Sequence, residues 1–266
     1  MKHISSTQNT VIKDCILLQS KGKKRTEKKQ FVVEGSRELR LAHLAHYTIS
    51  TLFWCPEIFA KQDFASWIKT FNNHITVISV SLAVYQKMVI RGSTEGIVGI
   101  VNQKNNSLKS WQPHNKNPLV IVLESIEKPG NLGAILRTAD ASGVDAVIIT
   151  EEHTDIHHPN VIRSSVGGFF SATLFVCSNE EAKHFLQKNK INIYAASLQK
   201  SILYNKANYK ASTAFVMGSE AKGLSDFWRD QEVTAVKIPM LGYVDSLNVS
   251  VATSVLAYET VRQRNS

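Results

Sequence analysis

The feature that most constrains the fold is an alternation of short apolar runs and helical segments in the second half of the chain. The apolar run LVIVLESI precedes the glycine-bearing loop and helix of KPGNLGAILRTADASG, and the apolar run VDAVIIT follows. Continuous apolar strands alternating with helices are typical of a mostly parallel sheet covered on both faces. The second half is therefore predicted to be an α/β unit.

The alternation continues to the end of the sequence. The residues favour strands at 119–123, 145–150, 172–176, 191–196, 213–217 and 234–238. Helices are expected at 133–142, 179–189, near 224–229 and from about 247 onward, and the stretch HTDIHHPNVIRSSVGGFF is expected to be irregular.

The first part of the chain has its own alternation. Helices are expected in VIKDCILLQS, SRELRLAHLAHY, PEIFAKQDFASWIKTF and VSLAVYQKMV, and strands in QFVVEG, TISTLFWC, ITVIS and EGIVGIVNQ. The stretch KNNSLKSWQPHNKNP is rich in Asn, Ser, Lys and Pro without periodicity, which is typical of a linker. The prediction is a small α/β domain over 1–103, a linker over 104–117 and a second domain over 118–266.

The composition excludes several classes of protein. The first ten residues hold no apolar signal core, and no run approaches the roughly 18 apolar residues of a membrane span, so we expect a soluble, cytoplasmic protein without a membrane partner. The 3 cysteines are far apart, which favours reduced thiols. The histidines of HTDIHHP lack further ligands nearby, so no metal site is expected.

The basic charge is concentrated near the start of the chain. Residues 1–103 hold fourteen Lys and Arg against seven Asp and Glu, whereas the rest is nearly balanced. Such a density suits contact with nucleic acid phosphates, although a short charge run is also typical of a solvated loop. We favour RNA or DNA contact through Lys23, Lys24, Arg25, Lys28, Lys29 and Arg37.

Three polar segments interrupt the apolar second domain, each just after an expected strand. The first contains Asn131, which could cap a helix beginning near Gly133, and Arg137, whose guanidinium suits a phosphate. The second is VMGSEAKGLS and the third begins IPMLGYVDSLN. Taken singly, these residues are also ordinary caps and turns. Because ligands of open α/β sheets bind at the carboxyl ends of the strands, the concentration of all three favours a binding site.

These segments resemble the three motifs of the SpoU (TrmH-type) branch of the SPOUT RNA methyltransferases. NLGAILRTADASG, FVMGSEAKGLS and IPMLGYVDSLNVSVATSVLAYE match in order over most of residues 119–262. FVVEGSRELR and its surroundings are similar to the ribosomal-protein-like domain that some members carry to bind substrate RNA. IRSSVGG resembles a family segment near the cofactor pocket, which places Arg163 among the expected RNA contacts.

The resemblance implies a deep trefoil knot in the second domain, a homodimer with active sites at the subunit interface, and S-adenosylmethionine as cofactor. It implies a polar active-site set of Asn131, Arg137, Glu220, Ser246 and Asn248. It also implies a cofactor-binding set of Met217, Gly218, Ile238, Met240, Gly242 and Leu247.

The implied reaction is methylation of a ribose 2'-hydroxyl in RNA. Arginine holds its proton at ordinary pH, so we do not assign the role of base to Arg137. We expect Arg137, held by Ser246, to bind the phosphate beside the target and stabilise the developing alkoxide. Glu220 and Asn131 would then orient the arginine and the ribose.

The substrate domain favours 23S ribosomal RNA, with a transfer RNA ribose methyltransferase or a non-catalytic RNA-binding protein as alternatives. A dinucleotide-dependent enzyme is disfavoured because no G-x-G-x-x-G follows a strand.

Overall fold

The computed structural model describes residues 1–71, 74–90, 95–104 and 106–266. The chain forms two compact units. Unit 1 comprises residues 1–105 and the short insertion 157–163, and unit 2 comprises residues 106–156 and 164–266. One residue of the linker expected at 104–117, Asn105, lies outside the described residues, and Leu108 and Trp111 pack in the core of unit 2.

Unit 1 is built on a five-stranded mixed sheet in the order β1-β4-β3-β5-β2. Strand β5 runs antiparallel to both of its neighbours, and the other pairs are parallel. The strands span β1 Lys2–Ile4, β2 Gln30–Glu34, β3 Ile49–Trp54, β4 Thr76–Val80 and β5 Ile97–Asn102. The helices span α1 Thr10–Ser20, α2 Gly22–Lys28, α3 Ser36–Leu44, α4 Lys61–Ile68 and α5 Leu82–Met88.

Unit 2 is built on a seven-stranded parallel sheet in the order β10-β12-β9-β11-β6-β7-β8. The strands span β6 Leu119–Glu124, β7 Ala146–Thr150, β8 Leu174–Cys177, β9 Asn192–Ala196, β10 Ile202–Leu203, β11 Thr213–Met217 and β12 Val233–Lys237. The helices of unit 2 span η1 Leu108–Ser110, α6 Pro129–Ser142, α8 Gly168–Ser171, α9 Asn179–Lys188, η2 Tyr204–Lys206, η3 Asp226–Trp228 and α10 Val249–Arg264. The short helix α7, Pro159–Ser164, lies in the insertion of unit 1 except for its last residue. The predicted α/β class with a parallel sheet is confirmed.

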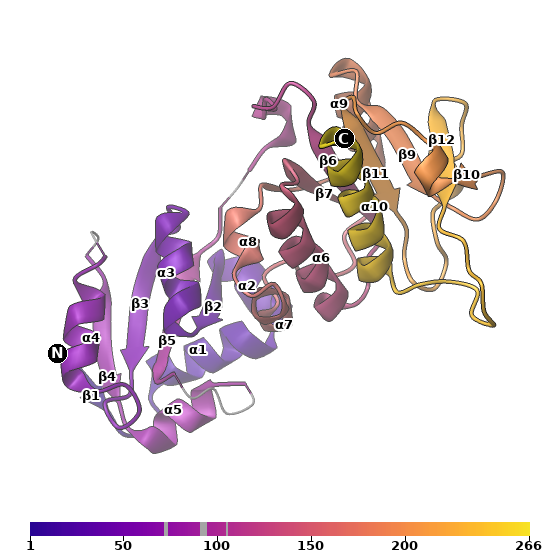
Figure 1. Cartoon of the computed structure of the whole chain (residues 1–266). Coiled ribbons are helices and arrows are strands. Elements are labelled where there is room, and N and C mark those ends of the chain that lie inside the picture. The colour runs from indigo at the N-terminus through magenta and orange to yellow at the C-terminus, as the bar shows by residue number, and fades with distance from the viewer. Residues whose placement is uncertain (72–73, 91–94, 105) are drawn as a thin grey trace. The chain divides into compact units, whose positions relative to one another are not determined.

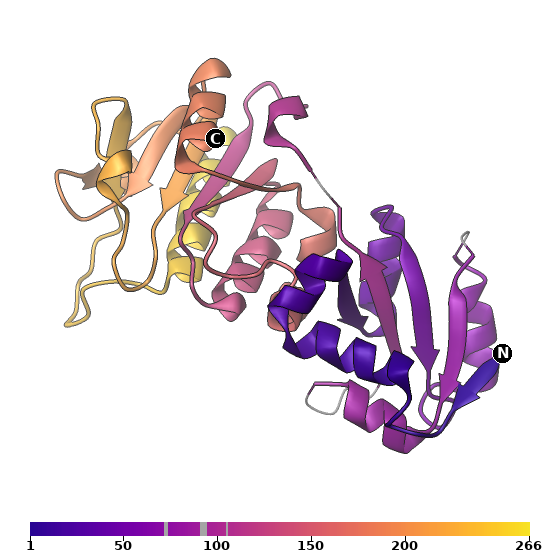
Figure 2. The same ribbon diagram turned by 180° about the vertical axis from the view of Figure 1, so that it is seen from behind.

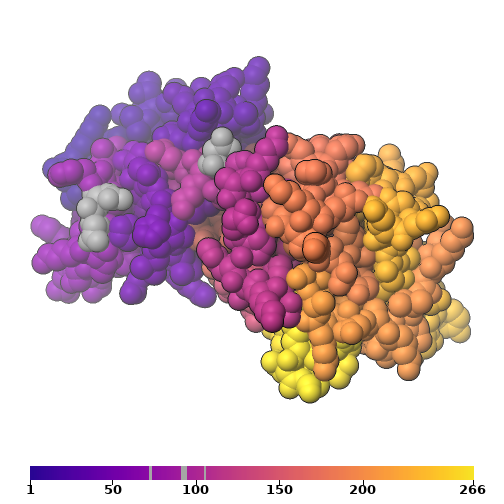
Figure 3. Space-filling model, turned by 90° about the horizontal axis from the view of Figure 1, so that it is seen from above, coloured from indigo at the N-terminus to yellow at the C-terminus, as the bar shows by residue number. Residues whose placement is uncertain are grey.

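Helices cover both faces of the unit 2 sheet. The helices α6 and α10 lie side by side on one face, and α9 covers the other (Figure 1 and Figure 2). On the α9 face, Phe185 and Leu186 pack against Val120 and Val122 of β6. The C-terminal turns of α10 reach the surface of unit 2 (Figure 3, yellow). Both faces of the strands β6, β7 and β11 are thus buried, which explains their nearly continuous apolar sequences.

Several element boundaries differ from the sequence prediction. The helix expected from residue 133 begins at Pro129, because proline is well suited to a first helical position. The helix expected to start at Pro56 begins only at Lys61. The stretch expected to be irregular contains the short helices α7 and α8.

The basic run was not predicted as a helix, yet its first part forms α2. Arg25 is the reason, because its side chain is only 2% exposed and donates through Nη1 to the carbonyl oxygens of Leu18 at 2.6 Å and Gln19 at 2.9 Å. These carbonyls belong to the last turn of α1, where helical partners are lacking. The prediction that Arg25 contacts RNA is therefore wrong: its charge is used inside unit 1.

The described part of the chain holds no helix long and apolar enough to cross a membrane. It also holds no cluster of three or more His, Cys, Asp or Glu side chains arranged to bind a metal ion. Cys15 and Cys55 are buried and Cys177 is half-buried, all three as free thiols. Burial raises the pKa of each thiol, so these cysteines are weak nucleophiles.

Replacing Arg25 should destabilise unit 1. In Arg25→Ala the two carbonyl oxygens lose a charged donor, and we expect the free energy of unfolding to fall by about 3 kcal/mol. Lys28→Ala, on the exposed side of the same helix, should change it by less than about 0.5 kcal/mol. Urea unfolding followed by circular dichroism measures both, and equal effects of the two substitutions would refute the assignment.

Candidate functional site

A pocket of about 500 Å³ opens at the carboxyl ends of the unit 2 strands. Its lining comes from four segments at the ends of strands, 196–199 at β9, 217–224 at β11, and 236–240 and 245–249 at β12, together with α10 and the single residues Lys128 and Arg229. From β6 the sheet first extends in one direction through β7 and β8. The later strands β9, β11 and β12 lie on the other side of β6, with β11 next to it. This reversal of strand order is the place where open α/β sheets bind ligands.

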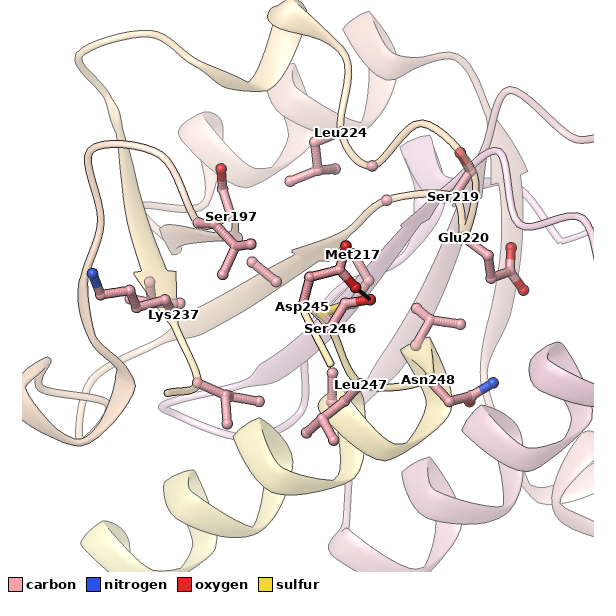
Figure 4. Close-up of a pocket in the computed structure, with 18 of the residues that line it drawn as sticks. Ser197, Met217, Ser219, Glu220, Leu224, Lys237, Asp245, Ser246, Leu247 and Asn248 are labelled. Atoms are coloured by element: carbon pink, nitrogen blue, oxygen red, sulfur yellow. Dashed lines mark hydrogen bonds between the residues drawn. The ribbon is translucent and has the colours of Figure 1, made fainter. Parts of the chain in front are cut away.

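The pocket combines an apolar interior with polar residues at its sides. Met217, Leu224 and Leu247 supply apolar surface, whereas Lys237 and Ser197 lie at one side and Glu220 and Asn248 at the other (Figure 4). Apolar walls with a few convergent polar groups are typical of small-molecule sites.

Gly218 allows two backbone segments to touch beside the pocket. A Cβ atom at Gly218 would lie 2.2 Å from the carbonyl carbon of Gly223 and 2.4 Å from the nitrogen of Leu224. Ser219 and Gly223 close this loop by two backbone hydrogen bonds of 3.2 and 2.9 Å. Any larger residue at position 218 would push the Gly223 and Leu224 wall outward.

One chain of hydrogen bonds joins the three polar segments. Asn248 Nδ2 donates to Asn131 Oδ1 at 3.1 Å, and Asn131 Nδ2 donates to Glu220 Oε1. Asn248 Oδ1 caps α10 by accepting from the Ser250 nitrogen at 2.9 Å. The prediction that Asn131 caps a helix near Gly133 is wrong, because Asn131 lies within the first turn of α6 and its amide binds Glu220 instead.

The pocket takes in most of the residues expected for catalysis or cofactor binding. Those that line it are Met217, Gly218, Glu220, Ile238, Met240, Ser246, Leu247 and Asn248. Gly242 is not among the lining residues, and Asn131 reaches the pocket through Glu220 and Asn248.

Arg137 stands apart from this group. It lies on the exposed side of α6, does not line the pocket, and its side chain makes no hydrogen bond or ion pair with the described residues. The expected contact between Arg137 and Ser246 is not formed within one chain, because Ser246 Oγ instead donates to Asp245 Oδ1 at 3.3 Å.

The basic residues expected to contact RNA are placed in unit 1. Lys23, Lys28 and Lys29 are exposed on α2 and its C-terminal cap, and Lys24 is half-buried there. Arg37 is exposed on α3, and the exposed Arg163 belongs to the insertion of unit 1, where it donates to the Ile90 carbonyl oxygen at 3.3 Å. Arg25 is excluded from this set because it is buried. The candidate RNA contacts that remain are Lys23, Lys24, Lys28, Lys29, Arg37 and Arg163.

Sequence reasoning missed the pocket segment 196–199. It follows β9, a strand that the sequence predicted at 191–196, so the carboxyl-edge argument applies to it equally. It lacks the glycine and acidic residues that drew attention to the other segments.

Comparisons with known proteins agree with this arrangement. A sequence model of the SpoU rRNA Methylase family matches residues 118–258, and one of the MRM3-like substrate binding domain matches residues 9–99. The chain is 25% identical to 23S rRNA (guanosine(2553)-2'-O)-methyltransferase RlmP of Bacillus subtilis (strain 168), over 97% of this chain and 98% of that protein.

Solved structures give the same result over nearly the whole chain. A crystal structure of an RNA 2'-O ribose methyltransferase is similar with a TM-score of 0.84 and 32% identity, covering 99% of this chain and 100% of that one. The AdoMet-bound rRNA methyltransferase of Sinorhizobium meliloti is similar with a TM-score of 0.88 and 28% identity, covering 98% and 97%.

The close approach at Gly218 can be tested by substitution. Gly218→Ala places a Cβ atom against backbone, and we expect a loss of at least about 2 kcal/mol in unfolding free energy. Gly130→Ala adds the same atom to an open position of α6 and should be neutral or stabilising by up to about 1 kcal/mol. Thermal unfolding distinguishes them, and an unchanged melting temperature in Gly218→Ala would contradict the close contact.

Proposed function

The chain belongs to the SpoU rRNA methylase family, and on that premise we propose that it methylates a ribose 2'-hydroxyl of 23S ribosomal RNA with S-adenosylmethionine as the methyl donor. The observation that carries the proposal is the meeting of three separate polar segments at one pocket, joined through Asn248, Asn131 and Glu220. The similarity of the chain to the RlmP protein over almost its full length supports ribosomal RNA as the substrate.

The pocket suits a nucleoside joined to an amino acid. Its volume of about 500 Å³ falls within the usual range for such ligands, and its apolar walls lie beside polar side chains. Met217, Gly218, Ile238 and Leu247 would hold the cofactor. When bound, S-adenosylmethionine supplies an electrophilic methyl group.

The residues of the chain would prepare the attacking hydroxyl. A neutral hydroxyl is a weak nucleophile, so its proton must leave as the new bond forms. Arg137 remains protonated and cannot accept that proton, but its guanidinium can bind the adjacent phosphate and stabilise the charge on oxygen. Glu220, held in place by Asn131, would orient the ribose, and a water molecule or a substrate phosphate would take the proton.

A second copy of the chain would complete the site. Arg137 does not line the pocket of its own chain, and the neighbouring C-terminal segment exposes apolar side chains: Leu241, Tyr243, Val244, Val251 and Tyr258. Large exposed apolar surface marks an interface. The proposal is a homodimer in which this face is covered and Arg137 reaches the partner's pocket.

The topology supports a knotted C-terminal part. The chain passes from β12, outside β9, through residues 238–248 and back to α10, which packs on α6 and β11. We assign the trefoil knot of the family to these segments.

In unit 1, the exposed cations Lys23, Lys28, Lys29 and Arg37 would bind the RNA backbone.

Arg137→Ala should abolish the modification. Loss of a charged donor to the reacting oxygen is expected to reduce turnover about 10²- to 10³-fold, and Arg137→Lys, which lacks the planar fork, should be intermediate. Mass spectrometry of ribonuclease digests of ribosomal and transfer RNA, from cells with and without the protein, identifies the methylated ribose. Lys188→Ala, an exposed cation of α9, is the control and should retain full activity.

Three results would count against this mechanism. Full activity in Arg137→Lys would refute bidentate binding. A modification found in transfer RNA alone would replace the ribosomal substrate. No lost modification in any RNA would favour a non-catalytic RNA-binding protein.

The dimer can be tested by placing a charge in the exposed apolar face. Val251→Asp should shift the sedimenting species from twice 29.7 kDa to 29.7 kDa, because a buried unpaired carboxylate opposes association. Leu44→Asp, at an exposed leucine of unit 1, should leave the dimer intact. A wild-type chain that sediments as a monomer would overturn the proposal.

Mixing two inactive variants tests the shared site. A dimer of one Arg137→Ala chain and one Glu220→Ala chain has one complete site if Arg137 serves the partner's pocket. Random mixing should then restore about a quarter of wild-type activity, whereas no recovery is expected if both residues act within one chain.

A further inference from the structure

A buried carboxylate lies behind the pocket without lining it. Glu124 is the last residue of β6 and its side chain is only 3% exposed. It is not among the residues that surround the pocket. A carboxylate is costly to bury unless its oxygens accept hydrogen bonds, so the partners of Glu124 indicate its role.

Glu124 accepts three hydrogen bonds from two directions. Its Oε2 accepts from the Ser225 nitrogen at 2.8 Å, and its Oε1 accepts from Ser225 Oγ at 2.6 Å and from Asn179 Nδ2 at 2.7 Å. Asn179 Oδ1 in turn accepts from the indole Nε1 of Trp228 at 3.1 Å. Both Asn179 and Trp228 are buried.

The direction of this network is fixed by its chemistry. The indole nitrogen of Trp228 can only donate, so Asn179 must turn its oxygen toward Trp228 and its amino group toward Glu124. The backbone nitrogen of Ser225 also can only donate. Glu124 must therefore accept at both oxygens, which a carboxylate does and a carboxamide of the same shape cannot.

The network holds one wall of the pocket from behind. Ser225 directly follows Leu224, whose side chain lines the pocket (Figure 4). Gly223 and Leu224 form the backbone that touches Gly218. Trp228 ends the short helix η3 that continues from Ser225. Both ends of the segment 225–228 are thus tied to Glu124, one directly and the other through Asn179.

We infer that Glu124 is a positioning residue for cofactor binding, which sets the Gly223 and Leu224 wall of the pocket through Ser225 and Trp228. The inference rests on the proposed function, since it takes S-adenosylmethionine as the ligand of the pocket. Glu124 does not line the pocket, so its loss should weaken cofactor binding and leave the chemical step nearly unchanged.

Glu124→Gln is the direct test. The substitution replaces one accepting oxygen by an amino group, which then faces a group that can only donate, either the Ser225 nitrogen or the Asn179 amino group. We expect the dissociation constant for S-adenosylmethionine, measured by calorimetry on the full-length protein, to rise about tenfold or more. The KM for the cofactor should rise in parallel, with kcat at saturating cofactor within about twofold of wild type.

Asp145→Asn is the matched control. Asp145 Oδ2 accepts from the Leu119 nitrogen at 2.7 Å, so the same change of carboxylate to carboxamide is made at the opposite end of β6. Its melting temperature should fall, but its affinity for S-adenosylmethionine should match that of wild type. Equal loss of affinity in both variants would show a general effect of stability and overturn the inference.

Ser225→Ala keeps the test decisive if Glu124→Gln folds poorly, and a double variant tests the direction of the network. Ser225→Ala, at an exposed position, removes one bond to Glu124 and should weaken cofactor binding about threefold. Trp228→Phe removes the indole donor that fixes the orientation of the Asn179 amide. In the double variant with Glu124→Gln, Asn179 can therefore turn its oxygen toward the new amino group at position 124. Glu124→Gln with Trp228→Phe should therefore weaken binding by less than the product of the single effects.

The outcomes separate the two proposals. Wild-type protein that binds S-adenosylmethionine while Glu124→Gln and Ser225→Ala bind it equally well would overturn the role of Glu124 alone. Wild-type protein that does not bind S-adenosylmethionine would overturn the proposed function. Fully multiplicative effects in the double variant would refute the fixed direction of the network.

Discussion

The structure of the site depends on the parallel pairing of β6 with β11. In this register Leu123 lies opposite Met217, so the two strands end at the same level of the sheet. Gly218 then turns the chain beside the pocket, while Glu124 anchors the returning wall at Ser225. A shift of one residue would turn the side chains of β11 to the opposite faces of the sheet. The turn at Gly218 would then no longer lie level with Glu124, which anchors the wall at Ser225. The register is held by buried, mostly apolar side chains on both faces of both strands.

Most of the secondary structure of unit 2 could be predicted because its strands are short apolar runs bounded by polar residues. The place of the site followed from the same pattern, since parallel strands bring their carboxyl ends together. The partners of individual side chains could not be predicted. The sequence predicts that Asn131 caps a helix beginning near Gly133, but the bond of Asn131 to Glu220 depends on a contact 89 residues away. The insertion 157–163 packs with unit 1, which no local pattern indicates.

The basic run shows the limit of counting charges. Its composition predicts contact with a polyanion, but composition does not tell which cations face water. The lysines around Arg25 in the sequence are exposed or half-buried, but Arg25 itself is buried, and its planar guanidinium reaches two carbonyl oxygens at once. A lysine offers a single nitrogen and would satisfy this geometry less well. The position of one arginine is thus decided by the end of α1 and not by any ligand.

The chain of Asn248, Asn131 and Glu220 has a consequence for the order of folding. Asn131 is separated from Asn248 by 117 positions, and the pocket needs segments from β9, β11, β12 and the start of α10. Contacts between such distant segments are costly in loop closure entropy and form late. The pocket is therefore absent from a growing polypeptide until the segment that begins α10 has been synthesised and docked. Competence to bind a ligand arises in one late step, after the sheet that supports it already exists.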